Sequence, residues 1–412
     1  MKKISRYFFW ACIVFGLIIR LFSLSYNGIF DLATYNEWGL ATLRNGLGHS
    51  YMGIYFPFQY QIFEFSSWLS GILNLDYFFV FKSVNLVFDC GNLIILTLIL
   101  RKLGVSEFYS LIYWLHPWFL NMFSLGYVDF QFTFFILCSL YFIFRDTSRD
   151  YLKAGIFLGF AFLMKPQVLI IFISFFIYAI VRYFRNKNIN MIHMFIFPII
   201  IFIDYYIFFL IQTGSTSVLS DAYLHTADYS PILNGHFLNG WFPVAYYLKG
   251  ANDPIHSVTD DLNGSGLPVR SIAIIIVLAL LFYFIIKAQR DSSVIKLNIG
   301  PYLTACFASF AVPFLMTAAH ENHLFLGTVL IIPVLAKSRN LLFKIIVHII
   351  LLLQFINLYG YYGIGENPYF QLPVYQYTYK AAMIMSFIAS SLFLALLYYF
   401  FSIKSKLFSS SE

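Results

Sequence analysis

The segment at residues 271–287, SIAIIIVLALLFYFIIK, carries a charge only at its last position. Its length is close to the ~20 apolar residues that an α-helix needs to cross a bilayer. Similar runs recur along the whole chain of 412 residues, of which 60% are hydrophobic and only 11% are charged. An ordinary soluble domain has roughly 25% charged residues. The sequence therefore predicts an all-α polytopic membrane protein and excludes a water-soluble fold.

Twelve apolar segments are candidate membrane spans, with boundaries that are good to a few residues. They lie at about residues 7–24, 77–100, 106–123, 127–144, 152–164, 168–182, 191–212, 271–287, 298–316, 323–336, 341–358 and 381–402. The segments 152–164 and 323–336 are shorter than the usual ~17–25 residues, so each is either a half-helix or extends into flanking polar residues. We expect a bundle of about 12 (10–13) transmembrane helices, forming a single transmembrane domain over residues 1–412.

The distribution of Lys and Arg indicates the orientation, because cytoplasmic loops carry an excess of both. With the N-terminus in the cytoplasm, 19 of the 26 Lys and Arg residues lie on the cytoplasmic side. The exceptions are Arg20, Arg44, Lys82, Lys165, Lys249, Arg270 and Lys380. Both termini are then predicted to be cytoplasmic. The net charge of +7 follows this topology and does not indicate a nucleic-acid partner.

The connections between the spans are long on one side only. Cytoplasmic connections are short, whereas the outer side carries the segments 25–76, 213–270 and 359–380. Long loops without regular structure of their own are usually functional. We therefore expect any chemistry or recognition on the outer side of the membrane, with juxtamembrane helices in the first of these loops.

The first outer loop contains a candidate catalytic carboxylate. Residues 31–45, DLATYNEWGLATLRN, have the pattern of a short amphipathic helix that ends at Gly46. Tyr35 and Trp38 then share a face with Asp31, four and seven positions along the helix. The alternative is that Asp31 caps the helix and that the two aromatic residues belong to the interfacial aromatic belt.

Further polar residues are predicted at the outer ends of other spans. They are Asp129, Lys165 and Gln167 in KPQ, Asn239 and Trp241 in LNGW, Arg270, and His320, Glu321 and His323 in AAHENHLF. Each also has a structural alternative: a helix cap for Asp129, snorkelling for Lys165 and ordinary hydrogen bonding for the histidines. The two histidines are three positions apart and lack the H-E-x-x-H spacing of a zinc site, so we expect no metal.

The order of these motifs resembles that of the polytopic GT-C glycosyltransferases, which take a sugar from a polyprenyl-phosphate donor on the outer or lumenal face. The resemblance spans residues 1 to about 340 and is closest to bacterial members and to dolichyl-phosphate-glucose and mannose enzymes with an HE motif. Besides Asp31, Tyr35 and Trp38, it rests on Phe56-Pro57, Gly126 to Asp129, Lys165 to Gln167, Asn239 to Trp241, and His320, Glu321, Leu324 and Phe325. Three departures are Phe58 in place of a second proline, Asn322 in place of a basic residue, and Leu125 to Asp129 in place of W-G-Q-x-D.

The resemblance implies a GT-C-like fold and an inverting transfer of a hexose to a lipid-linked or cell-surface glycan. Asp31 is then the base that takes the proton of the acceptor hydroxyl. Lys165 and His320, with Arg270 and His323 as weaker candidates, bind the donor phosphate. Tyr35, Trp38, Asp129, Gln167, Asn239, Trp241 and Glu321 bind or orient the substrates. No cofactor is implied beyond the lipid-phosphate donor, because cationic side chains can stabilise the leaving phosphate.

Two other classes of membrane protein fit the same composition. A secondary transporter or lipid-linked glycan flippase is suggested by Asp89 and Asp204, which lie within apolar spans. A polysaccharide polymerase or ligase also has many spans and a large outer loop. The expected partners are a polyprenyl-phosphate sugar, a glycan or glycolipid acceptor and membrane lipids. The residue usage suggests a bacterial cytoplasmic membrane, whereas the sugar, the polyprenol and the acceptor are not specified by the sequence.

Overall fold

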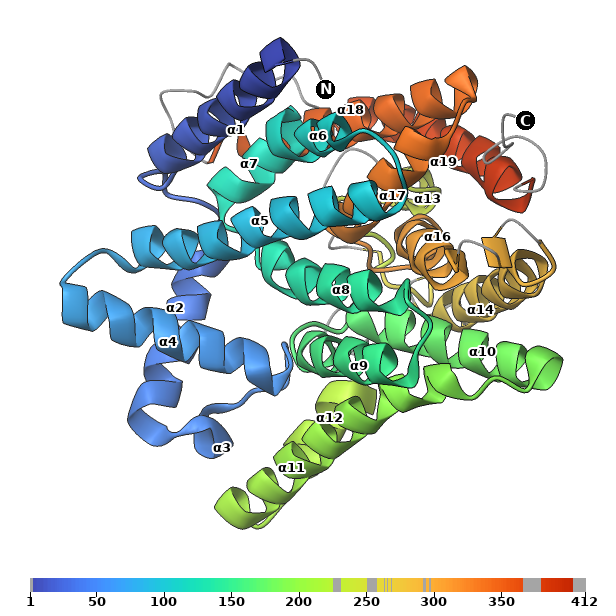
Figure 1. The fold of residues 1–412 in the computed structure, drawn as a ribbon. Coiled ribbons are helices and arrows are strands. Elements are labelled where there is room, and N and C mark those ends of the chain that lie inside the picture. The colour runs from blue at the N-terminus through green and yellow to red at the C-terminus, as the bar shows by residue number, and fades with distance from the viewer. Residues whose placement is uncertain are drawn as a thin grey trace. The chain divides into compact units, whose positions relative to one another are not determined.

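The computed structural model describes residues 3–224, 231–249, 258–262, 264, 266–267, 269–291, 294–295, 298–365 and 379–402. Regular structure in these residues is helical, apart from isolated β-bridges (Figure 1). Among these described residues, seven helical segments are long and apolar enough to cross a membrane. They are Arg6–Ser23 in α1 (Lys3–Ser23), α5 (Tyr77–Lys102), α10 (Val168–Asn186), Asn190–Thr213, α14 (Val269–Ala288), α18 (Leu341–Tyr362) and α19 (Tyr379–Phe401). The chain is therefore a multi-pass membrane protein.

The other predicted spans also contain helices, but shorter ones. They are α8 (Asp129–Ile143), α9 (Ser148–Phe162), α16 (Gly300–Leu315) and α17 (Phe325–Lys337). The segment expected at 106–123 is interrupted and forms η1 (Glu107–Tyr109), α6 (Ser110–Leu115) and α7 (Pro117–Leu125). His116 is extended between α6 and α7, because Pro117 lacks an N–H and cannot continue the preceding helix. A count of about twelve spans stays a prediction.

The chain forms two compact units. Unit 1 comprises Met1–Leu169, Asn190–Tyr229 and Tyr362–Gln371, and unit 2 comprises Ile170–Ile189, Ser230–Tyr361 and Leu372–Glu412. In unit 1, the 24 residues of Asn190–Thr213 combine η2 (Asn190–Phe195) and α11 (Ile196–Thr213). These are followed by α12 (Ser217–Leu224). The predictions of a single transmembrane domain and of a GT-C arrangement stay untested.

The first outer loop folds into three helices, which Figure 1 shows together at one end of unit 1. They are α2 (Asp31–Asn45), α3 (Leu47–Ser50) and α4 (Pro57–Leu73). The prediction of a helix over residues 31–45 that ends at Gly46 is confirmed. α2 packs closely on α4 at Gly39, where a Cβ atom would lie 2.5 Å from the carbonyl oxygen of Phe63. Only glycine permits this approach of the two backbones.

A buried ion pair joins α1 to α5. The guanidinium of Arg20 donates to the carboxylate of Asp89, and both side chains are fully buried. Tyr113 of α6 also donates to this carboxylate. The guanidinium lies 3.6 Å from the ring centroid of Trp114 and donates to that residue's carbonyl oxygen at 2.8 Å. Asp89, one of the two intramembrane carboxylates that suggested a transporter, therefore has partners that join three helices.

A second buried cation fixes the connection between α1 and α2. The ammonium of Lys82 donates to the carbonyl oxygens of Ser23, Tyr26 and Ser124. These acceptors use all three of its N–H groups. The backbone of Ile29 also donates to the carbonyl oxygen of Leu125 at 2.9 Å. Asp31 follows two residues later, so these bonds set where α2 begins.

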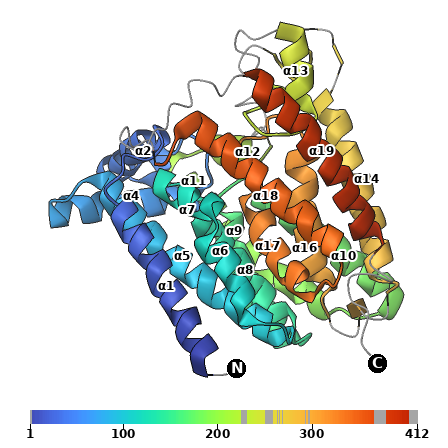
Figure 2. The same cartoon turned by 90° about the horizontal axis from the view of Figure 1, so that it is seen from above.

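In unit 2, α14 packs beside α16, and α16 packs beside α17 (Figure 2). α13 (Trp241–Lys249) lies against α19. Stacked rings fill the contacts: Phe284 and Phe307 have centroids 4.5 Å apart, and Phe314 and Phe393 are also 4.5 Å apart.

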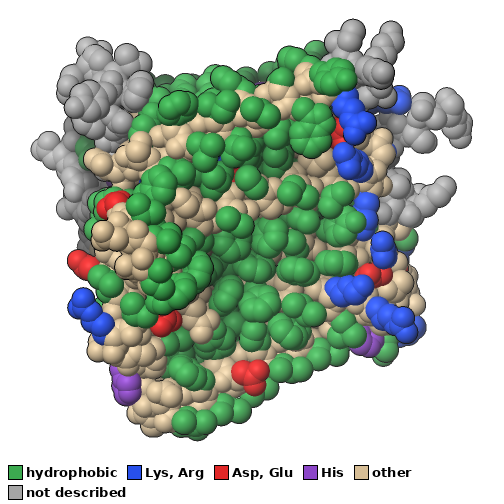
Figure 3. Space-filling model, turned by 60° about the vertical axis from the view of Figure 1, so that its left-hand side comes forward, with side chains coloured by type: hydrophobic (Ala, Val, Ile, Leu, Met, Phe, Trp, Pro, Cys, Tyr) green, Lys and Arg blue, Asp and Glu red, His purple; other side chains and the backbone are tan. Residues whose placement is uncertain are grey.

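The face shown in Figure 3 has the character expected of a membrane protein. Hydrophobic side chains cover most of its area, and Lys and Arg side chains gather along one edge. This arrangement agrees with a belt in contact with lipid and a charged edge in contact with water. The orientation of the chain across the membrane stays a prediction.

Breaking the ion pair of Arg20 and Asp89 should strongly destabilise the protein. Asp89→Asn leaves the guanidinium buried without its charge partner, which costs about 3–5 kcal/mol in buried pairs. Arg101→Gln removes the exposed partner of Glu107, and such pairs are worth only about 0–1 kcal/mol. The measurement is the thermal midpoint of each variant in detergent. Equal shifts for the two variants would contradict the role given to the buried pair.

The orientation can be measured by cysteine labelling. We expect an impermeant maleimide added outside intact cells to label Leu73→Cys, at the exposed end of α4, and not the exposed Arg339→Cys. The unmodified chain is the control, since its four cysteines lie in apolar helices. Labelling of position 339 and protection of position 73 would reverse the assigned sides.

Candidate functional site

Asp31 is the first residue of α2 and is half-buried. The N-cap position belongs to Phe30, and no side chain caps this helix end. The alternative role of Asp31 as the N-cap is therefore wrong. A carboxylate in the first turn is nevertheless stabilised by the positive end of the helix dipole.

Aromatic side chains surround the neighbouring hydroxyl groups. The buried ring of Tyr35 stacks on Phe63 with centroids 4.6 Å apart, and Trp38 stacks on Tyr60 at 5.4 Å. The hydroxyl of Tyr35 lies 3.5 Å from Oδ2 of Asp31 and 3.0 Å from the hydroxyl of Tyr55. The predicted shared face of Asp31, Tyr35 and Trp38 is thus confirmed. We call Asp31, Tyr35, Trp38 and Tyr55 the carboxylate site.

The two tyrosines of the carboxylate site keep their protons at neutral pH. Burial raises the pKa of Tyr35 well above 10.0, and the neighbouring Tyr55 and Asp31 raise it further. The pKa of Tyr55 is raised by burial and then by the charge of Asp31, with a smaller contribution from Asp129. Both carboxylates therefore lie within electrostatic range of the Tyr55 hydroxyl.

Asp129 and Lys165 form a buried ion pair. The ammonium nitrogen lies 3.1 Å from each carboxylate oxygen, and the side chains are 1% and 7% exposed. Asp129 begins α8 without capping it, because the N-cap residue is Val128. The alternatives of a helix cap for Asp129 and of snorkelling for Lys165 are therefore wrong. Gln167, two residues after Lys165, is half-buried.

The aromatic-Pro element lies directly beside the turn that contains KPQ. The backbone N–H of Phe56 donates to the carbonyl oxygen of Met164 at 3.0 Å, and Phe58 donates to Leu163 at 2.9 Å. Pro57 starts α4, where its missing N–H leaves no helical bond unmade. Motifs separated by about a hundred residues in sequence are thus joined through their backbones.

A chain of buried amides next to this ion pair was not among the predicted site residues. Gln59 donates to Gln131 at 2.9 Å, Gln131 donates to Asn85 at 2.6 Å, and Asn85 donates to the carbonyl oxygen of Tyr127 at 3.0 Å. This chain connects α4, α8 and α5. Its signal in the sequence is the placement of Asn85, Asp89 and Asn92 on one face of an otherwise apolar helix.

In unit 2, the LNGW motif binds the end of α16. Asn239 donates to the carbonyl oxygens of Pro313 at 2.9 Å and Met316 at 3.3 Å. The indole of Trp241 donates to the carbonyl oxygen of Leu315 at 2.8 Å. These donors satisfy carbonyl groups that a helix end leaves without internal partners. The geometry therefore gives both residues a structural role.

The histidines lie in the turn between α16 and α17. The ring of His323 accepts a hydrogen bond from the backbone N–H of His320 at 3.2 Å, and the two rings are 5.2 Å apart. The His320 ring also packs on Gly235, where a Cβ atom would lie 2.8 Å from it. Glu321 is buried in the same turn.

Arg270, at the start of α14, is ion-paired with Asp260 and lies 3.4 Å from the hydroxyl of Thr317. This pairing offsets part of its charge. Within unit 1 the structure thus brings together Asp31, Tyr35, Trp38, Asp129 and Lys165. Within unit 2 it places Asn239, Trp241, Arg270, His320, Glu321 and His323 in the loops around the end of α16.

Neither a metal-ligand cluster nor a known relative indicates what these residues do. Over the described ranges, no group of three or more His, Cys, Asp or Glu residues is placed to hold a metal ion. The chain matches no family model, no curated protein and no solved structure.

The raised pKa of Tyr35 predicts a loss of stability in alkali. Above pH 10, the tyrosine of the unfolded chain ionises while the folded one stays neutral, so the free energy of unfolding falls as pH rises. Tyr35→Phe should make this fall shallower, by up to about 1.4 kcal/mol per pH unit. Phe63→Leu is the control, because it weakens the same packing without removing a titrating group. The measurement is denaturant unfolding between about pH 9 and 11, and identical slopes for wild type and Tyr35→Phe would refute the assignment.

Proposed function

We propose that this protein is an inverting glycosyltransferase of the GT-C type, which moves a hexose from a polyprenyl-phosphate donor to a glycan or glycolipid acceptor. The observation that carries the proposal is the carboxylate site: Asp31 is half-buried at a helix start, beside neutral tyrosines. A second carboxylate, Asp129, lies within electrostatic range and is paired with Lys165.

The two carboxylates differ in what they can do. Asp129 is buried and its charge is offset by Lys165, so it is a poor proton acceptor. Asp31 is reached by solvent and lies next to Tyr35, which stays protonated and can only donate to it. When two carboxylates have environments that differ in this way, they take different roles in acid–base chemistry. Asp31 is accordingly the proposed general base, and Asp129 a positioning residue.

In the proposed reaction, the acceptor hydroxyl attacks the anomeric carbon of the donor sugar. Its proton passes to a carboxylate oxygen of Asp31, and the bond between the anomeric carbon and the phosphate oxygen breaks. The leaving phosphate takes the electron pair and is stabilised by cationic and N–H donors. The 3.5 Å contact between Tyr35 and Asp31 is long for a hydrogen bond and would shorten as the substrate orders the site.

The proposed phosphate ligands have different capacities. Lys165 directs two N–H groups to Asp129, which leaves one for a phosphate oxygen. His320 lies in a turn that backbone bonds to Gly235 hold in place. Arg270 is the weaker candidate because Asp260 already pairs with it. His323 is a further weak candidate for the phosphate, and Glu321 and Gln167 are proposed to bind or orient the substrates.

The proposed setting is the outer face of a bacterial cytoplasmic membrane, with both termini in the cytoplasm. The donor and acceptor there are lipid-linked, so neither requires a soluble nucleotide-binding domain. The alternative of a transporter is less favoured, because one of the two carboxylates that suggested it, Asp89, is bound by Arg20 and Tyr113.

Asp31→Asn should abolish sugar transfer without unfolding the protein. Purified protein is given polyprenyl-phosphate glucose, mannose or an amino sugar together with a membrane acceptor fraction, and transfer is followed with a radiolabelled sugar. General-base catalysis contributes about 10²–10⁴-fold, so a rate loss of that size is expected. Glu37→Gln, an exposed carboxylate on the same helix, is the matched control and should keep the wild-type rate. Full activity of Asp31→Asn would eliminate Asp31 as the base, and transfer by neither protein with any donor would count against the enzyme itself.

A further inference from the structure

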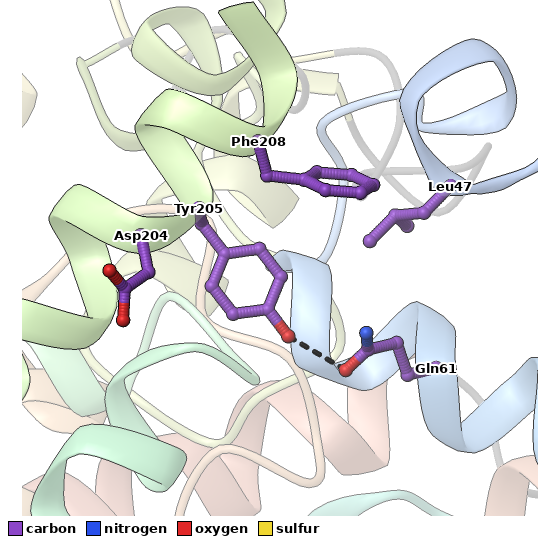
Figure 4. Close-up of a pocket in the computed structure, with 5 residues that line it drawn as sticks. All are labelled: Leu47, Gln61, Asp204, Tyr205 and Phe208. Atoms are coloured by element: carbon purple, nitrogen blue, oxygen red, sulfur yellow. Dashed lines mark hydrogen bonds between the residues drawn. The ribbon is translucent and has the colours of Figure 1, made fainter. Parts of the chain in front are cut away.

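A pocket of about 190 Å³ lies in unit 1 among α3, α4 and α11. It is lined by Leu47, Gln61, Asp204, Tyr205 and Phe208 (Figure 4). None of these residues belongs to the carboxylate site or to the ion pair of Asp129 and Lys165. The pocket is therefore a separate feature of this unit.

Asp204 is an unusual residue for its position. It lies inside the apolar span Asn190–Thr213 and is exposed between Ile203 and Ile207, which are themselves about half exposed. It makes no hydrogen bond or ion pair with any residue that the structure describes. A carboxylate at a surface that faces lipid is costly and marks a functional position by default. A polar group supplied by a ligand would satisfy it.

The other polar groups of the pocket complement this carboxylate. The hydroxyl of Tyr205 donates to Oε1 of Gln61 at 2.7 Å, which fixes the amide. Figure 4 shows the amide nitrogen of Gln61 turned toward the space beside Leu47 and Phe208, while the carboxylate of Asp204 lies on the other side of the Tyr205 ring and points away from Gln61. The pocket thus offers an N–H donor and aromatic rings, and a carboxylate acceptor lies beside it across the ring of Tyr205. Hydroxyl groups both donate and accept, so a sugar matches this set better than an ammonium, which only donates.

The charge of the pocket is unsuited to the polyprenyl-phosphate donor. The carboxylate of Asp204 repels a phosphate, and the described residues that line the pocket include no Lys or Arg. An anionic polyprenyl phosphate is therefore a poor occupant. The exposed Ile203 and Ile207 beside the pocket provide a surface for hydrocarbon chains.

We propose that this pocket binds the sugar hydroxyls of an uncharged glycolipid whose chains lie along α11, and that this glycolipid is the acceptor, a role that rests on the proposed function. Asp204 accepts hydrogen bonds from hydroxyl groups, Gln61 donates one, and Tyr205 holds Gln61 in place. The acceptor then enters laterally from the membrane.

Binding can be tested without the reaction. The full chain in detergent micelles is examined by native mass spectrometry with a diglucosyl diacylglycerol, phosphatidylglycerol or phosphatidylethanolamine of identical acyl chains. We expect selective retention of the glycolipid, and a loss of affinity of about tenfold or more in Asp204→Leu and Gln61→Leu. Tyr205→Phe should weaken binding less. Tyr206→Phe, an exposed neighbour that does not line the pocket, is the matched control and should bind as wild type does.

The other outcomes overturn the proposal. Preference for phosphatidylethanolamine, lost in Asp204→Asn, would identify a cation site, and equal retention of all three lipids would identify an unselective surface. The Asp31→Asn variant should bind the glycolipid normally. Its rate of sugar transfer therefore tests the proposed enzyme function independently of the pocket. If Asp204→Leu loses glycolipid binding but transfers sugar with an unchanged KM for the acceptor, the pocket binds a lipid that is not the acceptor.

Discussion

Buried positive charges determine how unit 1 is built. A cation removed from water costs several kcal/mol unless partners surround it. Arg20 finds a carboxylate and a carbonyl group, and Lys82 finds three carbonyl groups. Because these partners come from different helices, the bonds to the two cations tie α1, α5, α6 and α7 to one another. The start of α2 is tied to that arrangement, and Asp31 is placed with it.

The need to pair buried polar groups also acts on the helices that follow α7. Asp129 and Lys165 neutralise one another between α8 and the turn after α9, and hydrogen bonds link the amides of Gln59, Gln131 and Asn85. A hydrogen-bonded network of this kind is costly to leave half made, so it holds its helices in register. The carboxylate site therefore rests on a polar frame inside an apolar unit.

Length and hydropathy predicted the long helices and the helix over residues 31–45 because those features depend on local sequence. The break at His116 was missed, since Pro117 lies within a continuous apolar run. Pairing was not predictable: Arg20 and Asp89 are 69 positions apart, and composition does not indicate which charges meet. Tyr55 was missed for a related reason. In a chain with 31 tyrosines, nothing local distinguishes the one whose hydroxyl meets Tyr35.

The difference between Asp31 and Asp129 illustrates what sequence could not supply. Both begin a helix, and both follow a stretch of aromatic and small residues. Lys165 neutralises one of them, whereas the other faces a tyrosine that keeps its proton. An ammonium stabilises the charged form of a carboxylate more strongly than a neutral hydroxyl does, so the paired carboxylate is the weaker proton acceptor. The chemistry open to each aspartate is therefore set by a partner that lies 36 residues away in one case and four in the other.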